Sequence, residues 1–230
     1  MMLKKWSDLP QELQIDAVRP YYDRLAKKQV SLFFKRMVDV VCSLLLLVLL
    51  SPVFLLLIVV IRLDSEGPAF FRQVRVTQYG KRFRIFKFRT MVQNADKLGS
   101  QVTTSNDARV TRVGRLIRKC RLDEICQLLN VLDGSMTFVG TRPEVPKYVE
   151  RYTPEMMATL LLPAGVTSRA SICFKDEERL LEAAEDTDRV YVEQVLPQKM
   201  VYNLEAINTF SFFGDFKVLF DTVIAVLKRD

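Results

Sequence analysis

The longest hydrophobic run in the chain extends from Val40 to Ile61, and none of its 22 residues is charged. As one straight helix the run would measure roughly 33 Å, against a bilayer hydrocarbon core of about 30 Å. It has no polar face, which argues against an amphipathic helix that covers a soluble core. The pattern therefore predicts a helix that enters a membrane.

Two features favour a re-entrant hairpin over a straight span. Pro52 lacks a backbone N–H and should kink the helix, and Ser51 can satisfy one of the freed backbone groups. The kink leaves arms of roughly 16 and 13 Å, and each arm reaches only about the middle of the bilayer. Basic residues flank both ends, so the positive-inside rule assigns both flanks to the cytoplasm. They are Lys27, Lys28, Lys35 and Arg36 before the run, and Arg62, Arg72, Arg75, Lys81, Arg82 and Arg84 after it. A spanning helix with a proline kink remains the alternative.

The rest of the chain predicts a mixed domain. Residues 69–91 alternate apolar and basic side chains around Tyr79-Gly80, which indicates a β-hairpin. Apolar spacings of three, four and seven predict one helix over residues 110–132, ended by Gly134. Further helices are expected over 143–162 and 190–207, with a turn at 163–165.

Residues 212–227 carry an aromatic-rich apolar stripe that either faces a protein core or lies among lipid headgroups. The predicted fold class is α+β and mainly helical, with a re-entrant helix broken at Ser51-Pro52, a small β-hairpin and interfacial amphipathic helices. We divide the chain into a polar extension of short surface helices (1–34), the membrane helix (35–63) and a catalytic domain on the cytosolic face (64–230).

Composition narrows the chemistry. A net charge of +7 and a pI near 9.3 fit an anionic partner, which could be a phosphate-bearing ligand, an anionic lipid surface or nucleic acid. The chain has no histidine, which excludes His bases, Ser-His triads and zinc sites with His ligands. The four cysteines form no CxxC pair and no cleavable signal peptide is visible, so we expect a reduced, cytoplasmic working domain.

Asp123 and Glu124 are the strongest candidates for catalysis. An acidic pair in the first turn of a helix is usually only a favourable contact with the helix dipole. This pair, however, is preceded by a basic cluster and followed by Arg142, and converging cations suit a bound diphosphate. The cluster consists of Arg112, Arg115, Arg118, Lys119 and Arg121. One carboxylate could then coordinate Mg²⁺ while the other attacks phosphorus.

A series of short motifs, taken in order, resembles the monotopic phosphoglycosyltransferases, a group of bacterial sugar transferases. The motifs are Lys35-Arg36-Met37-Val38-Asp39, Ser51-Pro52, Gly67-Pro68-Ala69-Phe70-Phe71-Arg72-Gln73, Lys87-Phe88-Arg89-Thr90-Met91, Leu122-Asp123-Glu124, Gln127-Leu128, Asn130-Val131-Leu132, Val139-Gly140 and Arg142-Pro143. The resemblance covers the chain from about residue 35 to its C-terminus.

The resemblance implies transfer of a sugar-1-phosphate from a nucleotide-activated sugar, usually a UDP-sugar, to a polyprenyl (undecaprenyl) phosphate, with release of UMP. Asp123 would be the nucleophile and form a covalent phosphosugar intermediate, and Glu124 would help to hold Mg²⁺. The expected substrate-binding residues are Lys87, Arg89, Arg118, Arg142 and Lys175. The expected location is the cytoplasmic face of the bacterial inner membrane, at the first membrane step of a glycan pathway. Nucleic acid is not an expected partner, and a homodimer is left open.

Two positions depart from the family pattern. Ser135 stands where the family often has an aspartate, and Thr141 stands where it often has a proline. The sequence does not identify the sugar or the pathway. Two competing hypotheses stay open: a glycosyltransferase that moves only the sugar and releases UDP, and a membrane scaffold without catalytic activity.

Overall fold

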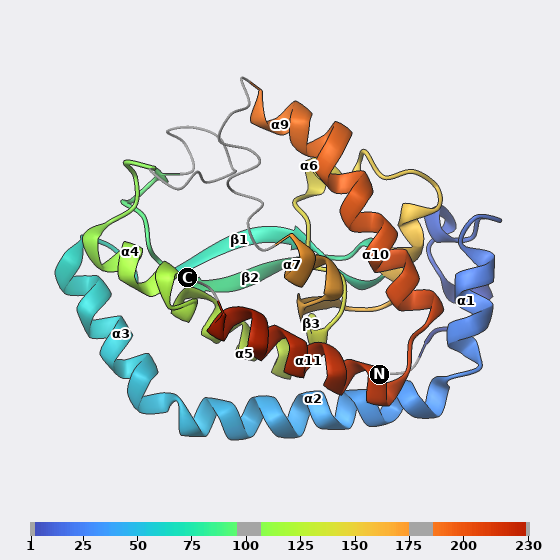
Figure 1. The fold of residues 1–230 in the computed structure, drawn as a ribbon, viewed down its shortest axis with the longest axis horizontal. Coiled ribbons are helices and arrows are strands. Elements are labelled where there is room, and N and C mark those ends of the chain that lie inside the picture. The colour runs from blue at the N-terminus through green and yellow to red at the C-terminus, as the bar shows by residue number, and fades with distance from the viewer. Residues whose placement is uncertain (1–2, 96–106, 175–185, 229–230) are drawn as a thin grey trace.

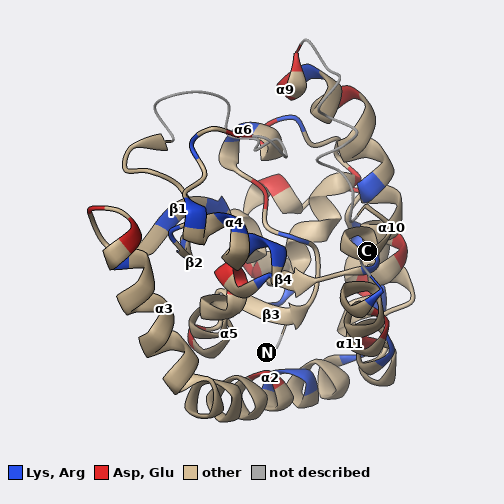
Figure 2. Ribbon diagram, turned by 60° about the vertical axis from the view of Figure 1, so that its left-hand side comes forward, with Lys and Arg blue, Asp and Glu red and all other residues tan. Residues whose placement is uncertain are grey.

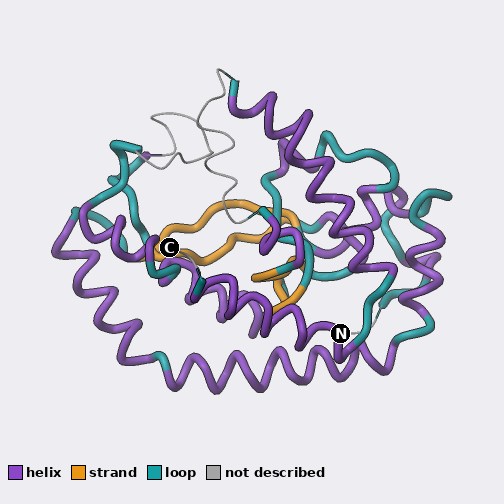
Figure 3. Tube along the Cα trace, viewed as in Figure 1, coloured by secondary structure: helices purple, strands orange, loops and turns teal. Residues whose placement is uncertain are grey.

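The computed structural model describes residues 3–95, 107–174 and 186–228. Figures 1 and 3 show a mainly helical protein in which helices surround a few short central strands. The longer helices are α1 (Arg19–Ala26), α2 (Gln29–Leu49), α3 (Ser51–Asp64), α4 (Arg112–Lys119), α10 (Leu196–Asn208) and α11 (Phe212–Leu227). The shorter ones are α5 (Leu128–Asp133), α6 (Pro146–Val149), α7 (Arg169–Cys173) and α9 (Thr187–Val190). The strands are β1 (Phe70–Val76), β2 (Arg82–Phe88), β3 (Met136–Val139) and β4 (Ala164–Thr167). The mainly helical α+β class is confirmed.

The hydrophobic run forms a bent pair of helices. In the part of the chain that the structure describes, no single helix is long and apolar enough to cross a bilayer, but α2 and α3 together could, with a bend of 61°. The bend follows Leu50, and Pro52 lies in the first turn of α3, where its missing N–H costs no hydrogen bond. Ser51 Oγ donates to the carbonyl of Val48 at 2.8 Å. That carbonyl is the one that an N–H at position 52 would have bonded, so the predicted helix break and its repair by Ser51 are both present.

A polar inner face of α2 holds this helix pair against the rest of the protein. Asp39 accepts hydrogen bonds from Thr137 Oγ1 at 2.7 Å and from the backbone N–H of Phe138 at 3.1 Å, both in β3. Lys35 pairs with Asp215 of α11 at 2.5 Å. Because Lys35 and Asp39 are buried, these contacts fix how α2 is oriented.

The outer faces of α2, α3 and α11 are apolar and exposed. Large side chains such as Leu45, Leu55 and Phe213 are between 64% and 81% exposed. On α11 only Val218 is buried among the residues that the structure describes, so most of the predicted aromatic stripe does not face a protein core. A continuous apolar surface of this kind marks a site of interaction with a membrane or a protein.

The predicted β-hairpin is confirmed. β1 and β2 pair antiparallel, and the turn contains Tyr79 and Gly80 with φ of 59° and 73°. On the free edge of β2 the buried side chain of Asn130 takes the place of a third strand. Its Oδ1 accepts from the N–H of Phe86 at 2.8 Å and its Nδ2 donates to the carbonyl of Arg84 at 3.3 Å. This contact fixes α5 against the hairpin.

The single helix predicted over 110–132 is wrong. α4 ends at Lys119, Arg121 adopts a left-handed φ of 55°, and a 3₁₀ helix (Leu122–Gln127) then leads into α5. Both helical pieces contribute apolar side chains to one cluster around Phe88, so the apolar spacing continues through the break and hides it. Gly134, with φ of 88°, ends α5 as expected.

The turn predicted at 163–165 is also wrong, because residues from Ala164 onward form β4, which pairs in parallel with β3. A Cβ on Gly165 would lie 2.1 Å from the carbonyl oxygen of Gly140, so this approach of the two chains requires glycine. The helix predicted over 143–162 is reduced to α6 and a 3₁₀ helix (Met156–Leu161). The helix over 190–207 is confirmed, although it includes a π-helical turn (Tyr191–Val195).

The N-terminal region forms the predicted short helices: α1 and two 3₁₀ helices (Trp6–Asp8 and Gln11–Leu13). Several apolar side chains of this region are buried and do not lie on the surface. Leu9, Leu13 and Leu25 are buried in a core cluster that also includes residues near the hairpin turn and the end of α10. The extension is therefore packed into the body of the protein.

Candidate functional site

The sharp turn at Arg121 sets the position of the acidic pair. It starts a new 3₁₀ helix with Asp123 and Glu124 in its first turn, whereas the sequence had placed this pair inside one continuous helix. Consecutive side chains on a 3₁₀ helix point about 120° apart, because the helix has about three residues per turn. The two carboxylates therefore have different surroundings.

Glu124 is held by two cations from separate parts of the fold. Lys87 Nζ, on β2, lies 2.9 Å from Oε1. Arg142, in the loop after β3, donates through Nη1 to Oε2 at 3.2 Å and through Nη2 to Oε1. Burial by itself would raise the pKa of Glu124, but the charges and hydrogen bonds of Arg142 and Lys87 hold it well below its usual range. Glu124 is therefore ionised at neutral pH.

Asp123 is half-buried. Among the described residues, no side chain of another residue donates a hydrogen bond to its carboxylate or forms an ion pair with it. Burial raises the pKa of Asp123 and the neighbouring charge of Glu124 adds to the rise, while Lys87 and Arg118 oppose it. The structure thus presents one neutralised carboxylate beside one that is available to a ligand.

Arg118 is placed close enough to act on this pair. Its Nε donates to Thr90 Oγ1 at 2.8 Å, and its charge lowers the pKa of Asp123. α4 reaches this position because Gly114 has no side chain: a Cβ there would lie 2.1 Å from the carbonyl oxygen of Thr90. Lys87, Arg118 and Arg142 thus gather around the two carboxylates, and their predicted contact with substrate stays a prediction.

Arg89 has a different environment from the one predicted. It is buried, and its guanidinium donates to the carbonyls of Ser65 at 2.6 Å and Glu66 at 2.8 Å, just beyond the end of α3. These contacts supply hydrogen-bond donors to the carbonyl groups that follow α3. The guanidinium of Arg89 therefore has a structural role. The predicted anion contact through Arg89 stays a prediction, which these contacts do not favour. Lys175 lies outside the described residues.

The sequence did not single out a second buried network behind the Arg142 loop. Tyr191 Oη donates to Glu144 Oε1 at 2.5 Å. Lys199 Nζ lies 3.0 Å from the same hydroxyl and 3.5 Å from Glu144 Oε1. The carbonyl of Glu144 also accepts from the N–H of Val76 at 3.0 Å. The network ties the loop that carries Arg142 to β1 and α10. The only sequence signal was Glu144 itself, two residues after Arg142.

Ser135 has a structural role. Its backbone N–H bonds Asp133 Oδ1 at 2.7 Å, its carbonyl accepts from Thr77 Oγ1 at 2.6 Å, and its hydroxyl lies 3.1 Å from Asn130 Nδ2. Ser135 thus belongs to the turn between α5 and β3. These contacts account for a small polar residue there.

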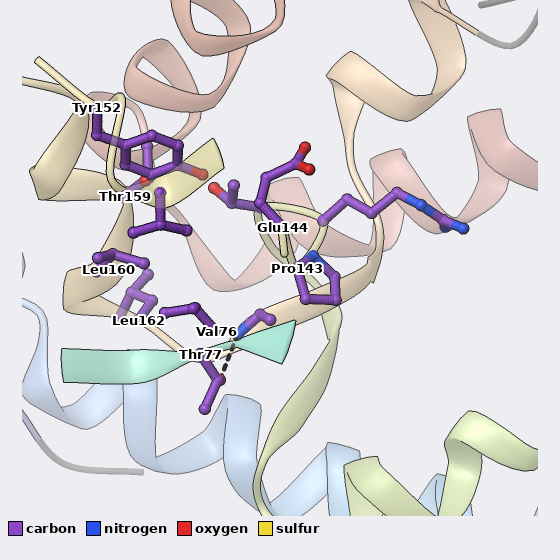
Figure 4. Close-up of a pocket in the computed structure, with 12 residues that line it drawn as sticks. Val76, Thr77, Pro143, Glu144, Tyr152, Thr159, Leu160 and Leu162 are labelled. Atoms are coloured by element: carbon purple, nitrogen blue, oxygen red, sulfur yellow. Dashed lines mark hydrogen bonds between the residues drawn. The ribbon is translucent and has the colours of Figure 1, made fainter. Parts of the chain in front are cut away.

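A small cavity lies between the hairpin end and the Arg142 loop. Figure 4 shows Tyr152, Leu160 and Leu162 on one side of it, with Pro143 and Glu144 on the other. Its volume is about 10 Å³, which is room for at most one water molecule. The cavity therefore cannot hold a nucleotide sugar.

A metal ion at this site would depend on the substrate. Within the described ranges, no group of three or more Asp, Glu or Cys side chains is arranged to hold a metal ion. Mg²⁺ commonly uses one or two carboxylates together with substrate phosphates and waters. The carboxylate of Glu124 accepts three hydrogen bonds of the roughly four that it can, which leaves a lone pair on Oε2. The residues present therefore fit a Mg²⁺ ion that is coordinated by the Glu124 carboxylate and by oxygens of a bound diphosphate.

Comparisons with known proteins identify the family of this chain. The family model described as bacterial sugar transferase matches residues 30–229. The chain is 35% identical over 200 residues to the UDP-glucose:undecaprenyl-phosphate glucose-1-phosphate transferase of Klebsiella pneumoniae, covering 84% of this chain and 40% of that protein.

It is also 34% identical over 198 residues to the UDP-N-acetylgalactosamine-undecaprenyl-phosphate N-acetylgalactosaminephosphotransferase of Aeromonas hydrophila, covering 85% and 44% of the two chains. The UDP-glucose:undecaprenyl-phosphate glucose-1-phosphate transferase of Caulobacter vibrioides is 36% identical over 199 residues, covering 85% and 70%. The chain thus spans about two-fifths of the length of the first two relatives. Because the match extends over most of its length, the chain belongs to the bacterial sugar transferase family.

Proposed function

We propose that this protein transfers a sugar-1-phosphate from a UDP-sugar to undecaprenyl phosphate and releases UMP. The activities for which its relatives are named support the donor and acceptor classes. The observation that carries the proposal for this chain is the pairing of Asp123, whose carboxylate is available, with Glu124, whose charge is neutralised by Lys87 and Arg142. The relatives differ in the sugar that they transfer, so the sugar itself is not part of the proposal.

In the proposed reaction Asp123 attacks the phosphorus that bears the sugar. A bond forms between a carboxylate oxygen and phosphorus, and the phosphoanhydride bond breaks, so UMP leaves with the bonding electron pair. The phosphate oxygen of undecaprenyl phosphate then attacks the same phosphorus and displaces the Asp123 carboxylate. The product is a lipid-linked diphosphosugar, and the enzyme is regenerated.

The cations at the site act on the charge of the donor. Arg118, Arg142 and Lys87 neutralise a diphosphate that would otherwise be repelled by two adjacent carboxylates. Glu124 would hold Mg²⁺, which supplies further charge neutralisation of the diphosphate when bound. Because Glu124 is already bonded to Arg142 and Lys87, it is the less suitable nucleophile of the pair.

The bent pair of helices α2 and α3 gives the reaction a location. In this proposal the pair enters the bilayer as a re-entrant hairpin, and the catalytic domain lies on the cytoplasmic face of the bacterial inner membrane. A soluble donor and a lipid acceptor must meet at one depth, and a hairpin joined to the domain through Asp39 would set that depth.

Purified protein incubated with a panel of UDP-sugars, undecaprenyl phosphate and Mg²⁺ tests the proposal by measuring UMP. We expect UMP from at least one sugar, none from Asp123→Asn, and an intact-mass adduct of one phosphosugar on the wild-type protein. Release of UDP would instead support transfer of the sugar alone. Absence of any turnover, or unchanged turnover in Asp123→Asn, would support a scaffold without this activity.

A further inference from the structure

α4 presents a basic face that the proposed reaction does not use. Arg112, Arg115 and Lys119 are exposed, and Leu116 between them is 64% exposed. The helix carries no acidic residue. Its N-terminus is already capped by the hydroxyl of Thr111, which accepts from a backbone N–H in the first turn. Of the exposed basic residues only Lys119 lies in the last turn, where the helix dipole favours a cation, so the dipole does not account for Arg112 and Arg115.

The opposite face of α4 fixes the helix to the end of α3. Val113 and Ile117 pack in the cluster that contains Leu57 and Ile61 of α3. The N–H of Val113 also lies 3.3 Å from Asp64 Oδ2, at the last residue of α3. Figure 1 shows α4 beside the end of α3 that is farther from the bend. α4 is thus fixed where the chain leaves the apolar helix pair.

The last turn of α3 extends this basic and apolar surface. Arg62 is exposed and Leu63 is 82% exposed. Within the described part of the chain, Arg62, Arg112 and Arg115 form no hydrogen bond or ion pair through their side chains, and neither does Lys119. Figure 2 shows basic positions along α4, in contrast to the mainly uncharged α3.

This surface combines basic side chains without partners and exposed leucines at the end of an apolar helix. Such a combination is typical of a surface that contacts lipid headgroups. Arginine and lysine bind the phosphates while apolar side chains between them enter the boundary of the acyl chains. A soluble polyanion would satisfy the charges but would leave Leu63 and Leu116 in water. The combination therefore favours a lipid surface over a soluble ligand.

We propose that α4 and the end of α3 bind the headgroups of anionic phospholipids, through Arg62, Arg112, Arg115 and Lys119, with Leu116 inserted among the lipids. This inference goes beyond the proposed function because it concerns bulk lipid, not the donor or acceptor. It predicts that anionic lipid is enriched around α4 relative to zwitterionic lipid. It does not depend on turnover.

A single-tryptophan reporter tests the enrichment directly. Trp6 is the only tryptophan, so a variant with Trp6→Phe and Leu116→Trp reports on α4 alone. The protein is reconstituted in phosphatidylcholine vesicles that contain a minor fraction of acyl-brominated lipid, either phosphatidylglycerol or phosphatidylcholine at the same mole fraction. Bromine quenches the reporter only when that lipid is adjacent. We expect stronger quenching by brominated phosphatidylglycerol, and loss of the difference at high salt.

Three controls make the result decisive. A reporter in α3, Trp6→Phe with Leu55→Trp, lies away from the basic surface and should be quenched equally by both lipids. In the Leu116→Trp background, the triple change Arg112→Gln, Arg115→Gln and Lys119→Gln should abolish the preference. A matched triple change at exposed basic residues elsewhere should retain it. These matched residues are Lys5, Arg24 and Arg151. Equal quenching by both lipids at Leu116→Trp, or a preference that survives loss of the α4 charges, would overturn the proposal whether or not the protein releases UMP.

Discussion

Thr137 of β3 donates its hydroxyl to Asp39 of α2 at 2.7 Å, and both side chains are buried. Asp39 also accepts from the backbone N–H of Phe138, so one carboxylate of α2 bonds a strand that leads directly to Arg142. The apolar helix pair and the rest of the protein are therefore joined by a specific polar contact. Its removal should affect the fold before it affects the chemistry.

We predict that Asp39→Leu lowers the free energy of unfolding by about 1–3 kcal/mol, because it leaves a buried donor on each of Thr137 and Phe138 without an acceptor. The measurement is the thermal unfolding midpoint in detergent micelles. Asp16→Leu, at an exposed position, is the matched control and should leave the midpoint unchanged. Equal midpoints for wild type and Asp39→Leu would show that the contact does not contribute to stability.

We predict that Glu124→Gln reduces UMP release by roughly 10²-fold or more, because electrostatic groups at a reacting centre typically contribute that much. The variant also leaves Arg142 and Lys87 without their shared partner. The free energy of unfolding of the variant should also lack the pH-dependent contribution of the ionised Glu124 carboxylate. The pKa of Glu124 is lower in the folded state, so its contribution is present at neutral pH and is lost as the pH falls below the ordinary glutamate value. The difference in unfolding free energy between wild type and variant should shrink in acid, and a constant difference would contradict this assignment.

The pH dependence of the proposed reaction should report Asp123. A nucleophilic carboxylate must be ionised, and burial raises its pKa above the ordinary value, so kcat/KM for UMP release should rise with pH on the acid side. Lys87 and Arg118 both lower the pKa of Asp123. Replacement of Arg118 by glutamine should therefore move the acid limb to higher pH, in addition to lowering the rate. An acid limb that does not move in Arg118→Gln would argue against an influence of Arg118 on the nucleophile.

Arg89 and Arg118 should separate stability from activity. Arg89→Met removes contacts to the carbonyls beyond α3 and should lower the unfolding midpoint, with little change in the turnover of the folded fraction. Arg118→Met should lower the turnover and leave the unfolding midpoint nearly unchanged, because the main partner of Arg118 is one threonine hydroxyl at the edge of the site. Thermal unfolding and UMP release measured on the same samples check both. A loss of turnover in folded Arg89→Met, comparable with that in Arg118→Met, would restore Arg89 as a substrate contact.

The buried network behind the Arg142 loop can be tested by its energetics. Lys199→Met removes the ion-pair partner of the buried Glu144 and should cost about 3–5 kcal/mol of unfolding free energy. Adding Glu144→Gln removes the charge that lost this partner and should recover part of that loss. Tyr191→Phe, which removes only a bridging hydroxyl, should cost about 1 kcal/mol. Strict additivity of Lys199→Met and Glu144→Gln would mean that the two charges do not interact.

The sequence by itself determined the features that have a local or compositional cause. The hydrophobic run, the break at Ser51-Pro52 and the β-hairpin at 69–91 follow from residue type and period. The basic residues near Asp123 and Glu124 indicated this pair, and the family resemblance then assigned a role to each carboxylate. Both the resemblance and these features depend on residues that are close together in the chain, and for that reason they could be read from it.

Only the tertiary structure decided how distant residues share the site. The left-handed turn at Arg121 interrupts a helix without changing its apolar spacing, so periodicity could not predict it. β4 has four residues and a parallel partner far back in the chain, so it leaves no local pattern. The difference between Arg89 and Arg118 depends on which partners each guanidinium meets after folding. That outcome is fixed by long-range packing and burial, and the sequence of either segment alone does not contain it.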